Sequence, residues 1–248
     1  MIERLVPDWP APGHVRAFTT TREGGVSTAG WTSLNLGGAT GDDPAHVVEN
    51  RARFEACLPA SAGWLKQVHG CDVVRREVLD TRTVEADAVW TAAPSLPCTL
   101  LTADCLPVLF TNKEGTVVAA AHAGWRGLAS GVLEATISAL PVDAADLLAW
   151  IGPGIGVNAY EVGSTFRDAF RARLPWLEVG FVDIEGRVHA DLEAVARAIL
   201  SRSGVTRLHG GGFCTYTDRE RFFSHRRQPQ GGRMATTIWI SPKLPGPR

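Results

Sequence analysis

A cysteine and a histidine stand at the open end of a predicted β-hairpin. The apolar runs Leu106 to Thr111 and Thr116 to Ala121 are joined only by Asn112-Lys113-Glu114-Gly115, which is typical of a tight turn. If Asn112 pairs with Gly115, Cys105 lies directly opposite His122, with Cβ atoms about 4.5–5.5 Å apart. One metal ion can accept a thiolate and an imidazole at that separation. The pattern indicates a metal site, although such a pair is more often structural and a bulged turn would shift the register by one residue.

A third ligand would turn this pair into a catalytic site. The candidates are the remaining histidines: His14, His46, His69, His189, His209 and His225. His69 stands out because it ends an apolar segment and is followed by a glycine that permits close approach, but spacing alone does not choose it. Two imidazoles and one thiolate leave the fourth tetrahedral position of a zinc ion open, and such a zinc supplies hydroxide at neutral pH.

The helices and strands that must position these residues are predicted from helix-capping residues and from the periodicity of apolar residues. We expect helices over 44–58, with Asp43 as N-cap and Pro44 in the first turn, over 127–140, over 191–203 with Asp191 as cap, and, more weakly, over 164–174. Strand-like runs cover 14–19, 72–78, 87–91, 98–102, 106–111, 116–121, 147–151 and 236–240. Strands outnumber helices, and the hairpin makes part of the sheet antiparallel, so the sequence predicts a mixed α+β layered fold.

Composition restricts the class of protein. The chain has 248 residues, of which 45% are hydrophobic, enough for one well-packed domain over residues 1–248 with a core at about 13–242. The chain has 25 basic and 26 acidic residues, so we expect no nucleic-acid partner. No apolar run is long enough for a membrane helix. The N-terminal segment lacks a signal-peptide pattern and the five cysteines are scattered, so we expect a cytoplasmic protein with reduced thiols.

Three other motifs carry weaker signals. Gly152-Pro153-Gly154-Ile155-Gly156 fails the dinucleotide and P-loop spacings, so we interpret it as a turn that needs unusual backbone angles. The arginines Arg219, Arg221, Arg226, Arg227 and Arg233 could hold an anion or form a solvated face. We interpret them as a solvated face, with the anion-binding alternative strongest for Arg233. The absence of any His-x-His pair argues against a multicopper oxidase.

Motifs in order along nearly the whole chain after about residue 13 resemble the multicopper polyphenol oxidase/laccase-domain family, also called the purine nucleoside phosphorylase or peptidoglycan-editing-factor family. They are Thr20 to Ser27, Ser33 to Gly37, Lys66 to Gly70, Thr102 to Pro107, Ala121 to Gly127, Gly152 to Gly156, Tyr160 to Val162, Gly212 to Thr215, Arg221 to Arg227 and Gly232 to Ala235. One departure is His225, where the family often has a tyrosine.

The resemblance implies a four-layer α/β/β/α sandwich with mixed β-sheets and one zinc ion held by His69, Cys105 and His122. It also implies phosphorolysis of purine nucleosides (adenosine, inosine, guanosine and methylthioadenosine) and deamination of adenosine, so the expected partners are a small-molecule nucleoside and phosphate. The family is further linked to cytoplasmic editing of peptidoglycan precursors that carry serine in place of alanine.

These reactions assign roles to four further residues. In deamination, hydroxide attacks C6 of adenine, and Asp104 is expected to move the proton to the leaving ammonia. Phosphorolysis needs a guanidinium to hold phosphate and stabilise charge, so Arg126 is expected to be catalytic and Arg51 to bind substrate. Asn35 is expected to bind a ribose or base edge.

Two alternatives of a different class stay open. In the first, the protein is an amide hydrolase that edits peptidoglycan precursors, with Cys105 as nucleophile and His122 or His69 as base, or with the zinc site itself. In the second, the protein is a binding module whose Cys–His site is structural and turns over no nucleoside.

Overall fold

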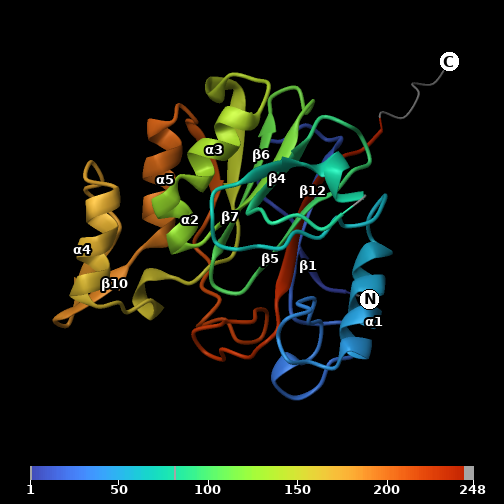
Figure 1. Cartoon of the computed structure of the whole chain (residues 1–248), viewed down its shortest axis with the longest axis horizontal. Coiled ribbons are helices and arrows are strands. Elements are labelled where there is room, and N and C mark those ends of the chain that lie inside the picture. Colours follow the sequence, from blue (N-terminus) through green and yellow to red (C-terminus); the bar gives the residue numbers. More distant parts are fainter. Residues whose placement is uncertain (1, 81, 243–248) are drawn as a thin grey trace.

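The computed structural model describes residues 2–80 and 82–242, and its core is two β-sheets packed face to face (Figure 1). The larger sheet is mixed, in the order β11 (Arg207–Gly210), β8 (Leu147–Ile151), β6 (Leu106–Asn112), β7 (Val118–Ala123), β4 (Ala88–Thr91) and β3 (Val73–Arg75). The smaller sheet is antiparallel, in the order β1 (Arg4–Leu5), β2 (Val15–Thr20), β12 (Met234–Ile240) and β5 (Cys98–Thr102). A separate hairpin pairs β9 (Phe181–Ile184) with β10 (Arg187–Ala190).

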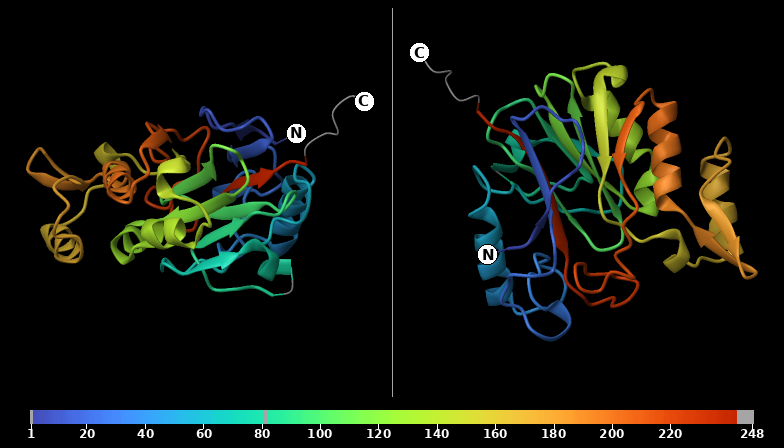
Figure 2. Two further views of the ribbon diagram at one scale, coloured as in Figure 1. Left: turned by 90° about the horizontal axis from the view of Figure 1, so that it is seen from above. Right: turned by 180° about the vertical axis from the view of Figure 1, so that it is seen from behind.

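Helices cover the outer faces of both sheets, as Figure 2 shows from above. α2 (Trp125–Ser130), α3 (Val132–Ala139) and α5 (Leu192–Arg202) pack on the larger sheet, and α4 (Ser164–Arg173) lies beyond them beside the β9–β10 hairpin. α1 (Pro44–Glu55) packs on the smaller sheet, where its Phe54 ring meets Phe18 of β2 at a centroid distance of 5.8 Å. The four-layer α/β/β/α sandwich expected from the resemblance is therefore confirmed.

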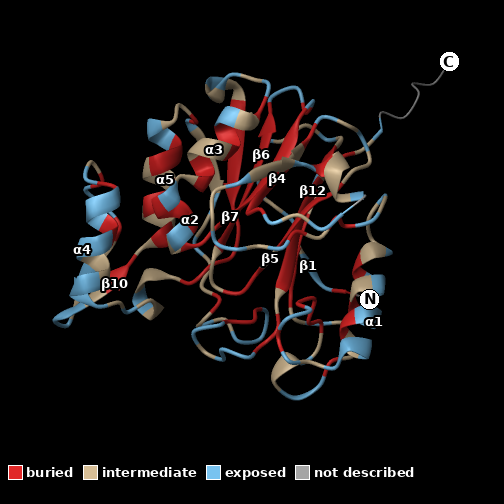
Figure 3. Ribbon diagram, viewed as in Figure 1, coloured by how far each residue is buried: buried red, intermediate tan, exposed pale blue. Residues whose placement is uncertain are grey.

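Alternation along the strands divides the core into two layers. Leu109, Ala120 and Trp150 of the larger sheet point toward Leu100 and Ile238 of the smaller one. Their neighbours in sequence point the other way and pack under the helices. Figure 3 shows the consequence, because the central strands are buried along their length whereas the helices expose their outer sides.

The helix predicted over 127–140 is two helices. Gly131 has φ +89° and ends α2, with its N–H donating to the Gly127 and Leu128 carbonyls, and α3 starts at the next residue. The Gly131 backbone is left-handed, a conformation that glycine adopts without steric penalty. By contrast, α1 and α5 start where predicted, since the Asp43 and Asp191 carboxylates accept the N–H groups of Ala45 and Ala194.

The register predicted for the central hairpin is wrong by two residues. The Asn112–Gly115 turn forms, with Gly115 N–H donating to Asn112 O at 3.0 Å. Thr116 and Val117 nevertheless stay outside the ladder, because their N–H groups donate to the Asn112 side-chain oxygen at 2.8 and 3.3 Å. The first pair is Thr111 with Val118, and His122 pairs with Pro107 instead of Cys105. A shift of two residues preserves which face each side chain occupies, so Cys105 and His122 remain neighbours.

Two further differences concern local chemistry. The strand predicted over 72–78 ends at Arg75, and a 3₁₀ turn at Arg76–Asp80 follows, because the buried Arg76 guanidinium donates to Pro97 O, Ser61 O and Asp80. In the Gly152–Gly156 loop no glycine has a positive φ. Its glycines are required by close packing, since a Cβ on Gly152 would lie 2.6 Å from the Trp150 ring.

No helix in the described ranges has the length and apolar character that a membrane span needs.

Candidate metal centre

Several strand ends converge at one edge of the sandwich. β5 ends at Thr102, the chain turns through Asp104 and Cys105, and β6 begins at Leu106. β7 ends beside them at Ala123, and β12 begins at Met234, the register partner of Thr102. Loops from both sheets therefore meet at this edge. Binding and catalytic residues often lie on loops that a rigid scaffold positions in this way.

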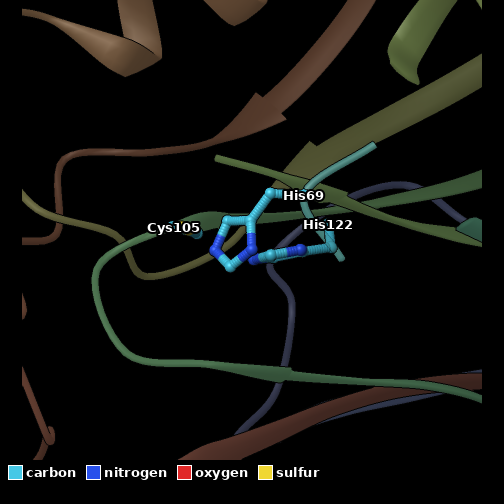
Figure 4. A group of neighbouring side chains, drawn as sticks. All are labelled: His69, Cys105 and His122. Carbon is cyan, nitrogen blue, oxygen red and sulfur yellow. The ribbon is translucent and has the colours of Figure 1, made fainter. Parts of the chain in front are cut away.

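Three potential metal ligands lie together at this edge. One nitrogen each from His69 and His122 and the sulfur of Cys105 lie within 4.8 Å of one another. Figure 4 shows the three labelled residues gathered at one point. The two imidazole rings meet edge to face, with centroids 4.8 Å apart. Over the described residues this is the one group of three or more such side chains with that spacing. The structure thus brings together the three residues that the resemblance selected.

Cys105 reaches the site because the residue opposite it has no side chain. Continuing the β6–β7 register one step beyond the Leu106–Ala123 pair places Cys105 across from Gly124. A Cβ on Gly124 would lie 2.6 Å from the Cys105 sulfur and 3.4 Å from a ring carbon of His69. Gly124 therefore leaves the space that the thiol and the imidazole occupy, and it also starts helix α2 as its N-cap.

A buried carboxylate orients both histidines. Asp87 precedes β4 and is fully buried, and its Oδ1 accepts a hydrogen bond from His122 Nδ1 at 2.8 Å. This bond directs Nε2 of His122 toward the other ligands. The same carboxylate accepts the backbone N–H groups of Val68, His69 and Gly70 at 3.1, 2.9 and 2.6 Å, which holds His69 at a left-handed φ of +61°. Asp87 was not identified from the sequence. The sequence did contain a signal for it, because Asp87 is an acidic residue between two alanines at the start of a predicted strand.

The ligands also tune one another electrostatically. Burial alone raises the pKa of the Cys105 thiol, but the His122 charge and hydrogen bonds from both imidazoles outweigh it and lower that pKa to about 6. Burial alone lowers the pKa of His122, but the Cys105 thiolate and Asp87 raise it to about 9. Burial likewise raises the pKa of Asp87, and hydrogen bonds from His122 and Gly70 more than reverse this. A thiolate is therefore available at neutral pH, the form that binds a metal.

This donor set fits a divalent transition metal. One thiolate and two imidazoles, with a carboxylate behind one imidazole, match a catalytic zinc site that has three protein ligands and an open fourth position.

The three candidate metal ligands, His69, Cys105 and His122, line a cavity of about 840 Å³. Asp104, Arg126 and Arg51 also line it, so the structure brings three of the four predicted catalytic and substrate-binding residues to the same space. Asp104 has φ +95°, and its two carboxylate oxygens each accept a 2.6 Å hydrogen bond, one from the Thr215 hydroxyl and one from Arg226 N–H. Arg126 lies over the Trp125 ring at 4.5 Å.

Asn35 does not reach the cavity. It is fully buried, and its amide nitrogen donates to Gly37 O, the Thr40 hydroxyl and Asp42. Its side-chain oxygen accepts N–H groups from Gly37 at 2.9 Å and Arg233 at 3.0 Å. A direct contact with a ribose or base would require one of these bonds to break.

The cavity also contains residues to which the sequence reasoning gave no site role. Arg226 lies over the Tyr160 ring at 4.9 Å, and burial raises the pKa of the Tyr160 phenol to about 12, which keeps it a neutral donor. Arg233 and His225 line the cavity as well, and His225 Nδ1 donates to Pro229 O at 3.0 Å. The arginine segment 219–233, expected to be solvated, thus contributes two cavity side chains, Arg226 and Arg233.

Comparison with known proteins agrees with this description. The family described as multi-copper polyphenol oxidoreductase laccase matches residues 16–241. The chain belongs to this family. A member from Pseudomonas aeruginosa, named purine nucleoside phosphorylase, is 52% identical over 95% of this chain and 98% of its own, and the Escherichia coli purine nucleoside phosphorylase YfiH is 47% identical over 97% and 100%. The crystal structure of a Neisseria meningitidis family member superposes with a TM-score of 0.91 at 45% identity, covering 96% of this chain and 99% of that one.

Proposed function

We propose that the protein is a zinc-dependent purine nucleoside phosphorylase that acts on adenosine, inosine, guanosine and methylthioadenosine and also deaminates adenosine. The observation that carries the proposal is the thiolate–imidazole group of His69, Cys105 and His122 opening into a cavity lined with arginines. Support comes from family members at 47–52% identity that are named purine nucleoside phosphorylases. The proposal places the reaction in the cytoplasm, where cysteines such as Cys105 stay reduced.

In phosphorolysis, a phosphate oxygen forms a bond to C1′ of the ribose while the C1′–N9 bond breaks and the base leaves with its electron pair. A bound zinc ion would supply Lewis acidity, and hydroxide at neutral pH for deamination. Arg126 is proposed to stabilise the charge that develops. Asp104, whose oxygens keep lone pairs free, is proposed to move the proton to the leaving ammonia during deamination.

The test is release of hypoxanthine from inosine by purified protein, with and without inorganic phosphate. We expect hypoxanthine and ribose 1-phosphate in equal amounts, dependent on phosphate and lost on chelation and in Cys105→Ser. Release without phosphate would make the protein a nucleoside hydrolase. No release from a fully metal-loaded protein would reject the proposal.

A second candidate is the amide hydrolase acting on peptidoglycan precursors, and the lowered pKa of Cys105 beside His122 favours it. Activity that survives complete removal of metal and is abolished by alkylating Cys105 would support this candidate over the phosphorylase.

A further inference from the structure

Four arginines line the cavity without a carboxylate partner. Arg51, Arg126, Arg226 and Arg233 form no ion pair within 4 Å over the described ranges 2–80 and 82–242, whereas arginines elsewhere, such as Arg53 with Glu49, do. Positive charge at a partly enclosed surface is unfavourable unless a counter-charge is supplied. Asp104 lines the same cavity and acts on Arg233, but it forms no ion pair with these arginines over the described residues. An anionic ligand in the cavity would supply the remaining counter-charge.

Arg51 is held with its outer nitrogens free. Its Nε donates to Leu36 O at 3.0 Å, and its guanidinium carbon lies 4.3 Å from the centre of the Trp64 ring. These two contacts fix the plane of the guanidinium group. Its terminal nitrogens, Nη1 and Nη2, have no hydrogen-bond partner among the described residues. One of them, Nη2, lies 3.6 Å from where a Cβ on Gly38 would be. Burial lowers the pKa of Arg51, although Glu55 opposes the shift.

Arg233 packs against Gly37, the glycine next to Gly38 in the sequence, and lines the same cavity. Its Nη1 donates to Gly231 O at 2.7 Å and Gly232 O at 3.0 Å, which leaves Nε and Nη2 without a protein partner over the described residues. Its Cγ packs on Gly37, where a Cβ would lie 2.7 Å away. The buried Asn35 oxygen accepts the N–H groups of both Gly37 and Arg233, so one amide group fixes the distance between them.

We propose that Arg51, Arg233 and the Gly37–Gly38 turn form an oxyanion subsite that binds inorganic phosphate. Two guanidinium groups with unpaired nitrogens suit the oxygens of a phosphate dianion. Gly38 leaves room for the anion, because only Arg51 Nη2 lies within 4 Å of where its Cβ would be. The assignment rests on the proposed phosphorolysis and specifies where its anionic substrate binds. It leaves Arg126, Arg226 and Tyr160 for the nucleoside.

The experiment compares Arg51→Lys and Arg233→Lys with Arg53→Lys, a control on the same helix whose exposed side chain pairs with Glu49. Lysine keeps the charge and removes the fork. Two readouts are taken on metal-loaded protein: the KM values for phosphate and inosine, and the rise in unfolding temperature on adding phosphate. We expect KM for phosphate to increase about tenfold in each subsite variant, with KM for inosine within about twofold and the control unchanged. Unfolding without ligand shows whether each variant is folded.

The outcomes separate the subsite from the proposed function. If wild-type protein performs phosphorolysis and both lysine variants keep its KM for phosphate, the subsite is wrong and the function stands. If phosphorolysis is absent but phosphate stabilises wild-type protein and not the two variants, the subsite stands and the function fails. If phosphate up to about 50 mM does not stabilise wild-type protein, the subsite is overturned, and stabilisation by inosine 5′-monophosphate alone would reassign it to a nucleotide phosphate.

Discussion

The Nδ1 atom of His122 lies 2.8 Å from Oδ1 of Asp87, and this buried carboxylate also accepts three backbone N–H groups from residues 68–70. Asp87 stands opposite His122 in the continuation of the β4–β7 register, and His122 N–H donates to Asp87 O at 2.7 Å. One side chain therefore positions two of the three candidate metal ligands, His69 and His122, although they are far apart in the sequence.

Replacing Asp87 should weaken metal binding without removing a ligand. Asp87→Asn removes the charge that holds His122 and the 68–70 backbone, so we expect the metal affinity to fall about 10- to 100-fold. Competition with a chromophoric chelator measures it. Asp146→Asn is the control, because it breaks an exposed pair with Lys113. Equal affinities for wild-type protein and Asp87→Asn would show that the carboxylate does not position the ligands.

The metal content of the purified protein should be one zinc ion per chain. Elemental analysis should find that ion reduced to trace amounts in His69→Ala, Cys105→Ser and His122→Ala, because two remaining donors hold zinc too weakly. His46→Ala should retain the metal, since this histidine contacts Asp42 instead of the site. Copper in place of zinc, or full zinc occupancy in Cys105→Ser, would be the contrary result.

The thiol of metal-stripped protein should react at unusually low pH. Because its pKa is lowered to about 6, Cys105 is mostly thiolate at pH 7, whereas burial raises the pKa of Cys98 far above the ordinary value. We expect iodoacetamide labelling of Cys105 to increase as pH rises through about 6 and to level off by about pH 8, while an ordinary thiol of pKa about 8.5 is still gaining reactivity. Peptide mass spectrometry resolves the two sites. A rate that climbs steadily up to about pH 9 would contradict the shift.

The Asp104 carboxylate should hold two loops against the cavity. In Asp104→Asn one oxygen becomes an NH₂ group, so either the Thr215 hydroxyl or the Arg226 N–H loses its acceptor. We expect faster trypsin cleavage at Arg226 and Arg227 with little change in the far-ultraviolet circular dichroism spectrum. Asp218→Asn, which loosens an exposed pair with Arg221, is the matched control. Identical cleavage in both variants would exclude the anchoring role.

Local sequence signals predicted much of the fold. Features that depend on particular side-chain contacts were not predicted. Helices α1 and α5 start where Asp43 and Asp191 cap them, because a cap acts within one turn. The hairpin register failed because Asn112 bonds two extra residues through its side chain, a choice that the turn sequence does not reveal. The break at Gly131 was missed because glycine is tolerated inside helical patterns.

The site was predictable only in its local part. The hairpin brought Cys105 and His122 into proximity. The selection of His69 came from family resemblance, because its loop is joined to theirs by long-range contacts, through the Asp87 carboxylate and the hydrogen bonds between Gln67 and Leu101. Asn35 was expected at the substrate and is instead buried behind Gly37 and Arg233. Arg233 was expected in solvent, and its place in the cavity follows from the β5–β12 pairing of Thr102 with Met234, which no local pattern encodes.

The glycines of the 152–156 loop should be needed because there is no room for side chains, and not because of their backbone angles. A Cβ on Gly154 would clash with the buried Leu106 side chain and would lie 3.0 Å from Asp104 O. The loop also fixes the approach to Cys105, since Ile155 N–H donates to Asp104 O at 2.9 Å.

We therefore expect Gly154→Ala to lower the free energy of unfolding by about 1–3 kcal/mol, the usual cost of overpacking, and to weaken metal binding as Asp104 and Cys105 shift. Gly163→Ala is the steric control, because no atom lies within 4 Å of the added carbon, and should change neither quantity. Gly131→Ala is the conformational control: at φ +89° it should lower stability through the backbone while leaving metal affinity intact. Chemical denaturation and chelator competition on the three variants separate these effects. A stable Gly154→Ala with wild-type metal affinity would mean that the loop can move aside and does not set the position of Cys105.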